Sequence, residues 1–172
     1  SSGILIADEV GLGKTIEAGL IWTELRARQD ARRLLVLCPA MLRDKWKMEL
    51  AERFGVKADI VDAAELHARL QAVKDRKHEG FALIASVQGL RPSRGWNDKD
   101  EPAKSSSAEL ARFLDEFELD EPLLDLTIID EAHYLRNQET QTYKLGALLR
   151  PVTLSMVMLS ATPIQLRNRD LI

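Results

Sequence analysis

The stretch Ala7–Thr15, with the sequence ADEVGLGKT, decides the expected fold of this chain. It follows the apolar run Gly3–Ala7 and precedes Thr15–Arg28, whose apolar residues recur at helical spacing. A glycine-rich turn between a strand and a helix is typical of a phosphate-binding loop, because glycine lets successive backbone N–H groups turn toward one anion. The N-terminal end of the following helix adds positive potential at the same place. Lys14 can then reach the β- and γ-phosphates of a nucleotide, and the Thr15 hydroxyl can ligate Mg²⁺.

Apolar runs and helical segments alternate along the rest of the chain. Further strands are expected at Leu34–Cys38, Ala58–Val61, Phe81–Ala85, Leu126–Asp130 and Leu154–Leu159, and further helices at Met41–Phe54, Ala63–Lys74, Ala108–Phe117 and Thr140–Leu149. Most of these strands are nearly continuous runs of Ile, Leu and Val, which is typical of parallel strands covered by helices on both faces. The sequence therefore predicts an α/β domain with a mainly parallel central sheet.

The first helix carries a specific expectation about packing. Ile16, Leu20, Ile21 and Leu25 recur about every four residues, which predicts a buried stripe. Gly19 is a weak helix former in the same segment, so its presence predicts a close contact between this helix and the sheet.

The stretch 91–121 departs from the alternation. It opens with the turn-forming sequence RPSRG, then carries acidic residues and a run of three serines. These features predict an exposed insertion, partly mobile, that contains one short helix and whose acidic residues form a solvated face.

Composition limits the class of protein. Among 172 residues, 24 Lys plus Arg accompany 27 Asp plus Glu, so the net charge is −3. This balance suits one globular domain and argues against a globally basic nucleic-acid binder, although a local basic face remains compatible with it. From Arg26 to Lys57, nine Lys and Arg accompany four Asp and Glu, which is a local surplus of five positive charges.

Cysteine and tryptophan carry mostly structural expectations. The single cysteine, Cys38, excludes a disulfide framework, and no Cys/His cluster has the spacing of a zinc site. Cys38, Trp22 and Trp46 are expected in the core rather than at reactive or base-stacking positions. No apolar run approaches the roughly 20 residues that cross a bilayer.

Two acidic residues follow another apolar strand in the stretch Leu126–His133, LTIIDEAH. Ligands of open α/β sheets bind at the carboxyl ends of strands, so Asp130 and Glu131 would lie beside the phosphate loop if the two strands are neighbours. Asp130 would then hold Mg²⁺ directly or through water, and Glu131 would orient or deprotonate the attacking water. Adjacent acidic residues also suit the start of a helix, where they meet its dipole.

A third polar segment, Ser160–Gln165 (SATPIQ), follows the last expected strand. Its hydroxyl groups can hydrogen-bond the Asp130–His133 segment and so respond to the phosphate. The same residues can start a helix at Thr162, with Pro163 at its first position.

These three segments, in this order, resemble motifs I, II and III of superfamily-2 helicases and translocases, and their wording is similar to the Swi/Snf family. Asp8–Thr15 matches the family's Asp-Glu-x-Gly-Leu-Gly-Lys-Thr, although phosphate loops in general have glycine in place of Asp8. Motif Ia matches at Cys38-Pro39, Leu42, Trp46 and Glu49. The continuation Ile16–Leu20 resembles the bacterial branch that includes RapA and certain phage-defence ATPases, while Ser160–Thr162 departs from the Thr-Gly-Thr of eukaryotic remodellers.

The resemblance implies a RecA-like P-loop NTPase domain over residues 1–172, the first lobe of a helicase-type motor. It assigns nucleotide binding to Asp8, Glu9, Gly11, Leu12, Gly13, Lys14 and Thr15. It assigns Mg²⁺ to Thr15 and Asp130, and catalysis to Lys14, Asp130 and Glu131. It assigns the coupling of nucleotide to movement to His133, Ser160, Thr162 and Gln165. It places Pro39, Ala40, Met41, Ser86 and Val87 near the nucleic-acid backbone.

The implied reaction is Mg²⁺-dependent ATP hydrolysis coupled to movement along nucleic acid, with double-stranded DNA as the expected track. Two alternatives stay open: a strand-separating DEAH-type RNA or DNA helicase, and a non-motor ATP-dependent switch. The chain opens at Ser1 and stops soon after motif III, so we expect a fragment that lacks the second lobe and hydrolyses ATP very slowly on its own. The expected partners are nucleic acid, that second lobe, and RNA polymerase or defence-system proteins, in the cytoplasm and without a membrane.

Overall fold

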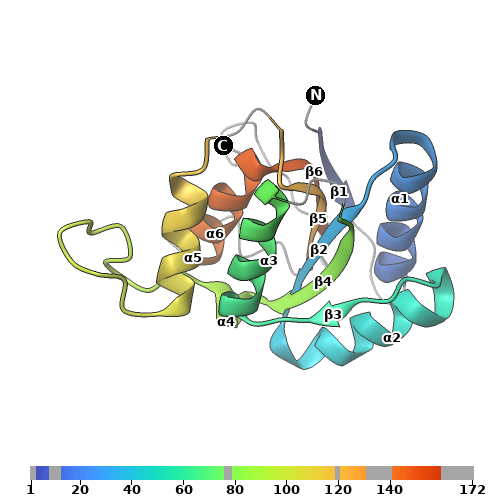
Figure 1. Ribbon diagram of the computed structural model, residues 1–172. Helices are drawn as coiled ribbons and strands as arrows, with labels where there is room; N and C mark the ends of the chain where they lie inside the picture. Colours follow the sequence, from blue (N-terminus) through green and yellow to red (C-terminus); the bar gives the residue numbers. More distant parts are fainter. Residues whose placement is uncertain (1–2, 8–12, 76–78, 119–120, 131–140, 160–172) are drawn as a thin grey trace.

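A parallel sheet forms the centre of the molecule, shown by a computed structural model that describes residues 3–7, 13–75, 79–118, 121–130 and 141–159. Six strands lie in the order β1-β6-β5-β2-β4-β3, and every neighbouring pair is parallel (Figure 1). The strands are β1 (Gly3–Ala7), β2 (Arg33–Cys38), β3 (Asp59–Ile60), β4 (Phe81–Ser86), β5 (Leu124–Asp130) and β6 (Thr153–Leu159). The expected α/β sheet is confirmed, and the strand boundaries shift by one or two residues at most.

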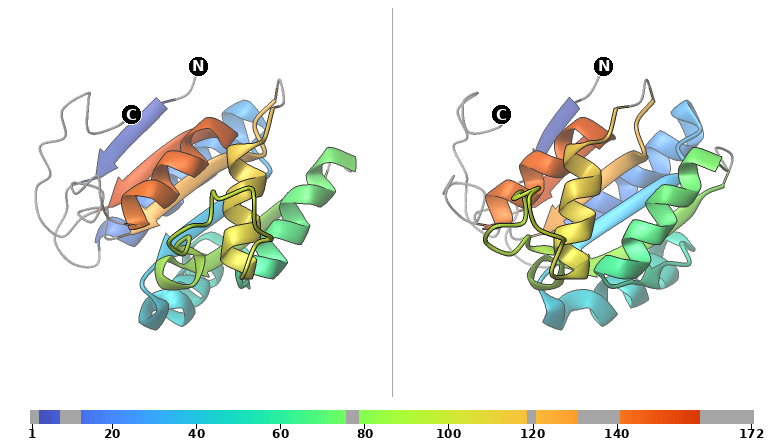
Figure 2. Two further views of the ribbon diagram at one scale, coloured as in Figure 1. Left: turned by 90° about the vertical axis from the view of Figure 1, so that its left-hand side faces the viewer. Right: turned by 60° about the vertical axis from the view of Figure 1, so that its left-hand side comes forward.

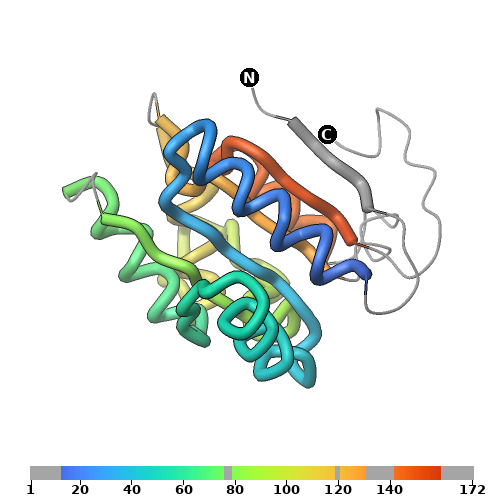
Figure 3. The backbone as a smooth tube through the Cα atoms, turned by 90° about the vertical axis from the view of Figure 1, so that its right-hand side faces the viewer, coloured from blue at the N-terminus to red at the C-terminus, as the bar shows by residue number. Residues whose placement is uncertain are grey.

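Helices cover both faces of this sheet, as expected. They are α1 (Gly13–Gln29), α2 (Arg43–Phe54), α3 (Ala63–Asp75), α4 (Val87–Leu90), α5 (Ser106–Asp115) and α6 (Gln141–Leu149), with short 3-10 turns η1 (Ala40–Leu42) and η3 (Arg150–Val152). Figure 2 shows α3, α5 and α6 on one face, and Figure 3 shows α1 and α2 on the other. Among the described residues, no helix is both long and apolar enough to cross a membrane.

The two faces have separate apolar cores, and side chains of one strand alternate between them. In β2, Leu35 and Leu37 pack toward α3, α5 and α6, whereas Leu34, Val36 and Cys38 pack toward α1 and α2. Both sets are almost completely buried. A strand with a core on each face needs apolar side chains at every position, which explains the continuous apolar runs in the sequence.

The packing of α1 differs from the expected stripe. Ala18 and Trp22 are buried, whereas Leu20 is 57% exposed and Ile21 and Leu25 are only partly buried. Gly19 makes its close contact with α2 rather than with the sheet, because a Cβ added there would lie 2.0 Å from Cε2 of Phe54. The expected stripe is thus observed only in part, and the close contact of Gly19 is with α2, because α1 lies beside α2 as well as on the sheet.

The stretch 91–121 is only partly the exposed insertion that was expected. The loop between α4 and α5 extends away from the sheet at the left of Figure 1. Helix α5, in contrast, buries Ala108, Leu110, Ala111 and Leu114 in the core beside α3 and α6, which corrects the expectation for this part. Arg112 of α5 also holds the loop, since its Nε donates to the Trp96 carbonyl at 2.6 Å and its Nη2 donates to the Asp98 carbonyl at 2.6 Å.

Candidate active site

Strands β1 and β5, which precede the first two motifs, are not neighbours in the sheet. The expected position of Asp130 beside the phosphate loop depended on the condition that they were. β6 lies between β1 and β5 and pairs with both. Leu159, at the end of β6, is in register with Ala7 on one side and with Asp130 on the other. The two motifs therefore follow strand ends at the same level of the sheet, with one strand between them.

A partly buried ion pair connects the two motifs. Lys14 lies in the first turn of α1, and its Nζ is 3.3 Å from Oδ1 of Asp130, a residue 116 positions later in the chain. The two side chains are only 13% and 7% exposed. Because a buried charge is costly unless it is paired, this contact accounts for an acidic residue at the end of an otherwise apolar strand. The expected convergence of Lys14 and Asp130 is thus observed, and Thr15 beside Lys14 is also buried.

The second oxygen of the same carboxylate is held from another helix. Nε1 of Trp46, in α2, donates a hydrogen bond to Oδ2 of Asp130 at 3.0 Å. Trp46 is 2% exposed, so its expected place in the core is confirmed. The polar role of its indole was not foreseen, although a buried indole N–H usually finds an acceptor.

Asp130 and Thr15 offer the type of ligand that Mg²⁺ prefers, namely hard oxygen atoms. In the described part of the chain, no three His, Cys, Asp or Glu side chains gather into a metal-binding group. Mg²⁺ commonly takes one or two carboxylates and completes its shell with phosphate oxygens and water. The Lys14 ammonium beside Oδ1 shows that the carboxylate already accommodates a positive charge. The residues therefore fit a Mg²⁺–nucleotide complex.

The negative charge of Asp130 also affects the pKa of Cys38, at the end of β2. Burial raises the pKa of its thiol to about 12, with a further contribution from the negative charge of Asp130, while Arg43 acts in the opposite direction. The thiol is completely buried and stays protonated near neutral pH. Its expected role as a small apolar residue is confirmed.

The first expected nucleic-acid loop reaches the surface. Pro39, Ala40 and Met41 follow β2, and the side chain of Met41 is 87% exposed. The loop is compact, because the Leu42 N–H donates to the Pro39 carbonyl at 2.9 Å and Nε of Arg43 donates to the Ala40 carbonyl at 3.0 Å.

In the second loop, the two residues expected near nucleic acid have buried side chains. The side chains of Ser86 and Val87 are buried, and Oγ of Ser86 caps α4 by accepting from the Gly89 N–H at 2.9 Å. The exposed residues of this turn are Gln88 and Gly89, which were not among the expected contact residues. Oε1 of Gln88 accepts from the Ala40 N–H at 3.1 Å and so links the two loops.

Several expected site residues lie outside the described residues and remain predictions. They are Asp8, Glu9, Gly11 and Leu12 of motif I, Glu131 and His133 of motif II, and Ser160, Thr162 and Gln165 of motif III.

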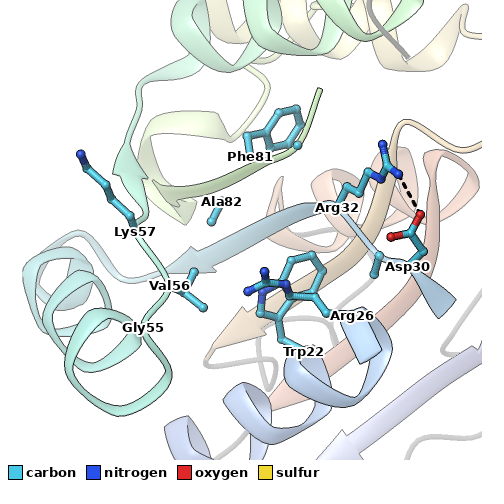
Figure 4. Close-up of a pocket in the computed structure, with 11 residues that line it drawn as sticks. Trp22, Arg26, Asp30, Arg32, Gly55, Val56, Lys57, Phe81 and Ala82 are labelled. Carbon is cyan, nitrogen blue, oxygen red and sulfur yellow. Dashed lines mark hydrogen bonds and ion pairs between the residues drawn. The ribbon is translucent and has the colours of Figure 1, made fainter. Parts of the chain in front are cut away.

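The basic stretch Arg26–Lys57 does not form one surface. Arg43, Lys45 and Lys47 belong to the first turns of α2, next to the loop that follows β2. Arg26, Arg32 and Lys57 instead line a pocket of about 460 Å³ near the amino ends of β2 and β4 (Figure 4). There Arg32 pairs with Asp30 at 2.9 Å. The positive charges are thus divided between opposite ends of the sheet.

Comparison with known proteins places this site in a family. The SNF2-related domain matches residues 1–172, the whole chain. The chain belongs to the SNF2-related domain family. A Bacillus subtilis protein named as an uncharacterized ATP-dependent helicase, YqhH, is 35% identical over 97% of this SNF2-related chain and 24% of its own length. The RNA polymerase-associated protein RapA of Photobacterium profundum is 31% identical over 95% of the chain and 15% of its own length.

Solved structures support the same fold for the SNF2-related chain. The SWI2/SNF2 ATPase core of Sulfolobus solfataricus, in complex with double-stranded DNA, matches with a TM-score of 0.61 and 21% identity over 98% of this chain and 29% of its own. The Hef helicase domain of Pyrococcus furiosus matches with a TM-score of 0.56 and 14% identity over 99% and 31%. The expected RecA-like fold and the resemblance to the Swi/Snf family, including RapA, are confirmed. The chain spans about a quarter or less of the two curated relatives.

Proposed function

We propose that this chain is the nucleotide-binding lobe of an ATPase that hydrolyses ATP and moves along nucleic acid. The Lys14–Asp130 ion pair carries the proposal, because it joins two motifs that are far apart in the sequence at the carboxyl end of the sheet. Open α/β sheets bind ligands at this end. Membership of the SNF2-related family and relatives named ATP-dependent helicase and RapA support the same reaction.

The described residues have separate tasks in this reaction. Lys14, at the N-terminal end of α1, would leave Oδ1 of Asp130 and bind the β- and γ-phosphates. Asp130 and Thr15 would hold Mg²⁺, which when bound offsets charge on the phosphate oxygens. Glu131, the residue after Asp130, is proposed to take the proton of the attacking water.

The proposed track is double-stranded DNA, which the Sulfolobus neighbour binds in its solved structure. On this chain it would lie over the loop Pro39–Leu42, where Met41 is exposed, and the turn at Gln88, beside Lys45 and Lys47. RNA polymerase is a candidate protein partner, since the RapA relative is named as associated with it. We also infer that a second lobe of the full-length protein supplies arginines to the γ-phosphate.

Glu131→Gln in the full-length protein tests the catalytic assignment. Loss of the general base should lower ATP turnover by about 10²–10⁴-fold, because proton transfer to a positioned base contributes about that much. ATP affinity should be kept, because the change removes no phosphate ligand. Turnover and equilibrium ATP binding are the measurements. Glu52→Gln, the same chemical change at an exposed position of α2, is the control. Turnover that survives Glu131→Gln would show that another group is the base.

The track is tested by comparing ATPase rates with duplex DNA, single-stranded DNA and RNA at low salt, together with strand displacement. Stimulation by duplex DNA without strand separation is the expected result for a translocase. Strand separation would instead indicate the helicase alternative. An ATPase that responds to none of these nucleic acids would favour the non-motor switch.

A further inference from the structure

Trp46 touches the proposed metal site without belonging to any motif that binds nucleotide. Its indole is buried, and its Nε1 donates to Oδ2 of Asp130 at 3.0 Å across 84 positions of sequence. Apolar packing alone would not require that bond. A core phenylalanine or leucine could fill similar space. What tryptophan adds at this position is the hydrogen bond from its indole N–H to the carboxylate of Asp130.

The carboxylate of Asp130 divides its two oxygens between two helices. Oδ1 faces the ammonium of Lys14 from α1, and Oδ2 accepts from Trp46 of α2. The lysine neutralises the charge and would be replaced there when a cation and phosphates bind. The indole is a neutral donor, so it can hold the carboxylate orientation while leaving its charge for the metal. Partners that orient a metal ligand in this way tune metal affinity and activity.

The same indole is tied to the surface loop Pro39–Leu42. Trp46 lies in the first turn of α2, directly after this loop. Arg43, also in that turn, donates to the Ala40 carbonyl, and the Ala40 N–H donates to Gln88. A helical turn is stiff, because each residue is fixed by hydrogen bonds along the axis. A displacement of the loop therefore reaches the indole within one turn.

We propose that Trp46 is a positioning residue that couples the Pro39–Leu42 loop to the metal-binding carboxylate of Asp130. Nucleic acid on the loop fixes the first turn of α2, and the indole N–H then holds Oδ2 so that Oδ1 faces the metal. This inference rests on the proposed function and adds a route by which nucleic acid stimulates hydrolysis.

Trp46→Phe in the full-length protein tests the coupling, because it removes the N–H and keeps an aromatic ring. The stimulation of ATPase by nucleic acid should fall about 10-fold or more, and the Mg²⁺ concentration for half-maximal activity should rise by a similar factor, as for other partners of metal ligands. The rate without nucleic acid should fall less. Mn²⁺ binding with a non-hydrolysable ATP analogue, followed by electron paramagnetic resonance, should weaken in parallel.

Trp22→Phe is a matched control. Trp22 lies in the same apolar core, is 3% exposed, and its Nε1 has no hydrogen-bond partner among the described residues. The two substitutions therefore remove the same volume, and only one removes a hydrogen bond. Equal effects of the two changes would overturn the proposal. So would a Trp46→Phe protein that loses stimulated and unstimulated rates equally with normal Mn²⁺ binding.

Fluorine NMR of the otherwise unaltered protein, labelled with 5-fluorotryptophan, covers the case in which Trp46→Phe does not fold. The Trp46 signal should shift when duplex DNA is added and broaden with Mn²⁺ and the ATP analogue, while the Trp22 signal changes less. A Trp46 signal that ignores both additions would overturn the coupling. The unaltered protein separates the two questions: an ATPase indifferent to nucleic acid refutes the proposed function, whereas stimulation that survives Trp46→Phe refutes the coupling alone.

Discussion

The carboxylate of Asp130 binds two neighbouring side chains and affects the pKa of a third. Lys14 and Trp46 occupy its two oxygens, and Cys38, at the end of the neighbouring strand β2, is affected by its charge. Burial and this charge together raise the thiol pKa from 9.0 to about 12. The folded state binds the Cys38 thiol proton more tightly than the unfolded state does. The thiol's contribution to the free energy of unfolding is therefore complete below pH 9.0 and is lost as the pH rises toward 12.

Cys38 should therefore resist alkylation in the folded protein. At pH 7.5 we expect almost no maleimide labelling of the Cys38 peptide under native conditions and full labelling in denaturant, because only the exposed thiolate reacts. Peptide-resolved mass spectrometry measures both. Cys38→Ala should lessen the loss of stability between pH 9 and 12. Rapid labelling of Cys38 in the folded protein would contradict its burial.

At the scale of elements, the contact between α1 and α2 depends on a single missing side chain. Gly19 lets the ring of Phe54 approach the backbone of α1, and an added Cβ would lie 2.0 Å from Cε2 and 2.3 Å from Cζ. Helix packing thus joins α1, which follows the phosphate loop, directly to α2, which follows the Pro39–Leu42 loop. Trp46, on the same helix as Phe54, donates to Asp130.

Gly19→Ala should destabilise the full-length protein by about 1–3 kcal/mol, because the aromatic ring must move away from the new methyl group. Combined with Phe54→Ala, the same change should become neutral or stabilising by about 1 kcal/mol, since alanine favours helix over glycine. Denaturant unfolding of the four proteins gives this double-mutant cycle. A Gly19→Ala protein as stable as the parent would contradict the close contact.

At the scale of the whole molecule, the basic residues of the stretch Arg26–Lys57 lie in two groups at opposite ends of the strands. Lys45 and Lys47 lie near the carboxyl ends, where nucleotide and nucleic acid are proposed to bind. Arg26, Arg32 and Lys57 surround the pocket near the amino ends. Electrostatic attraction to phosphates falls off with distance and with salt, so only the first group should contribute to the proposed interface.

Lys45→Ala with Lys47→Ala should weaken duplex DNA binding and lower the slope of log affinity against log salt by about one for each phosphate that the protein no longer neutralises. Arg26→Ala with Arg32→Ala removes the same number of charges and should leave both quantities unchanged. Fluorescence anisotropy of the full-length proteins at several salt concentrations measures them. An equal effect of the two pairs would place nucleic acid elsewhere on the chain.

The sequence by itself determined the succession of strands and helices along the chain and indicated that Lys14 and Asp130 belong to one site. These features depend on short-range patterns: apolar runs, helical spacing, and glycine before a helix. The same local logic placed Cys38, Trp22 and Trp46 in the core, and each is buried.

Only the tertiary structure decided how these elements meet. It placed β6 between the two motif strands, paired Trp46 with Asp130, packed Gly19 against Phe54, buried α5 and divided the basic stretch between two ends. Periodicity tells which face of an element is buried but not which element covers it. The contact between Trp46 and Asp130, across 84 positions, follows instead from strand order and helix packing, which no local pattern encodes.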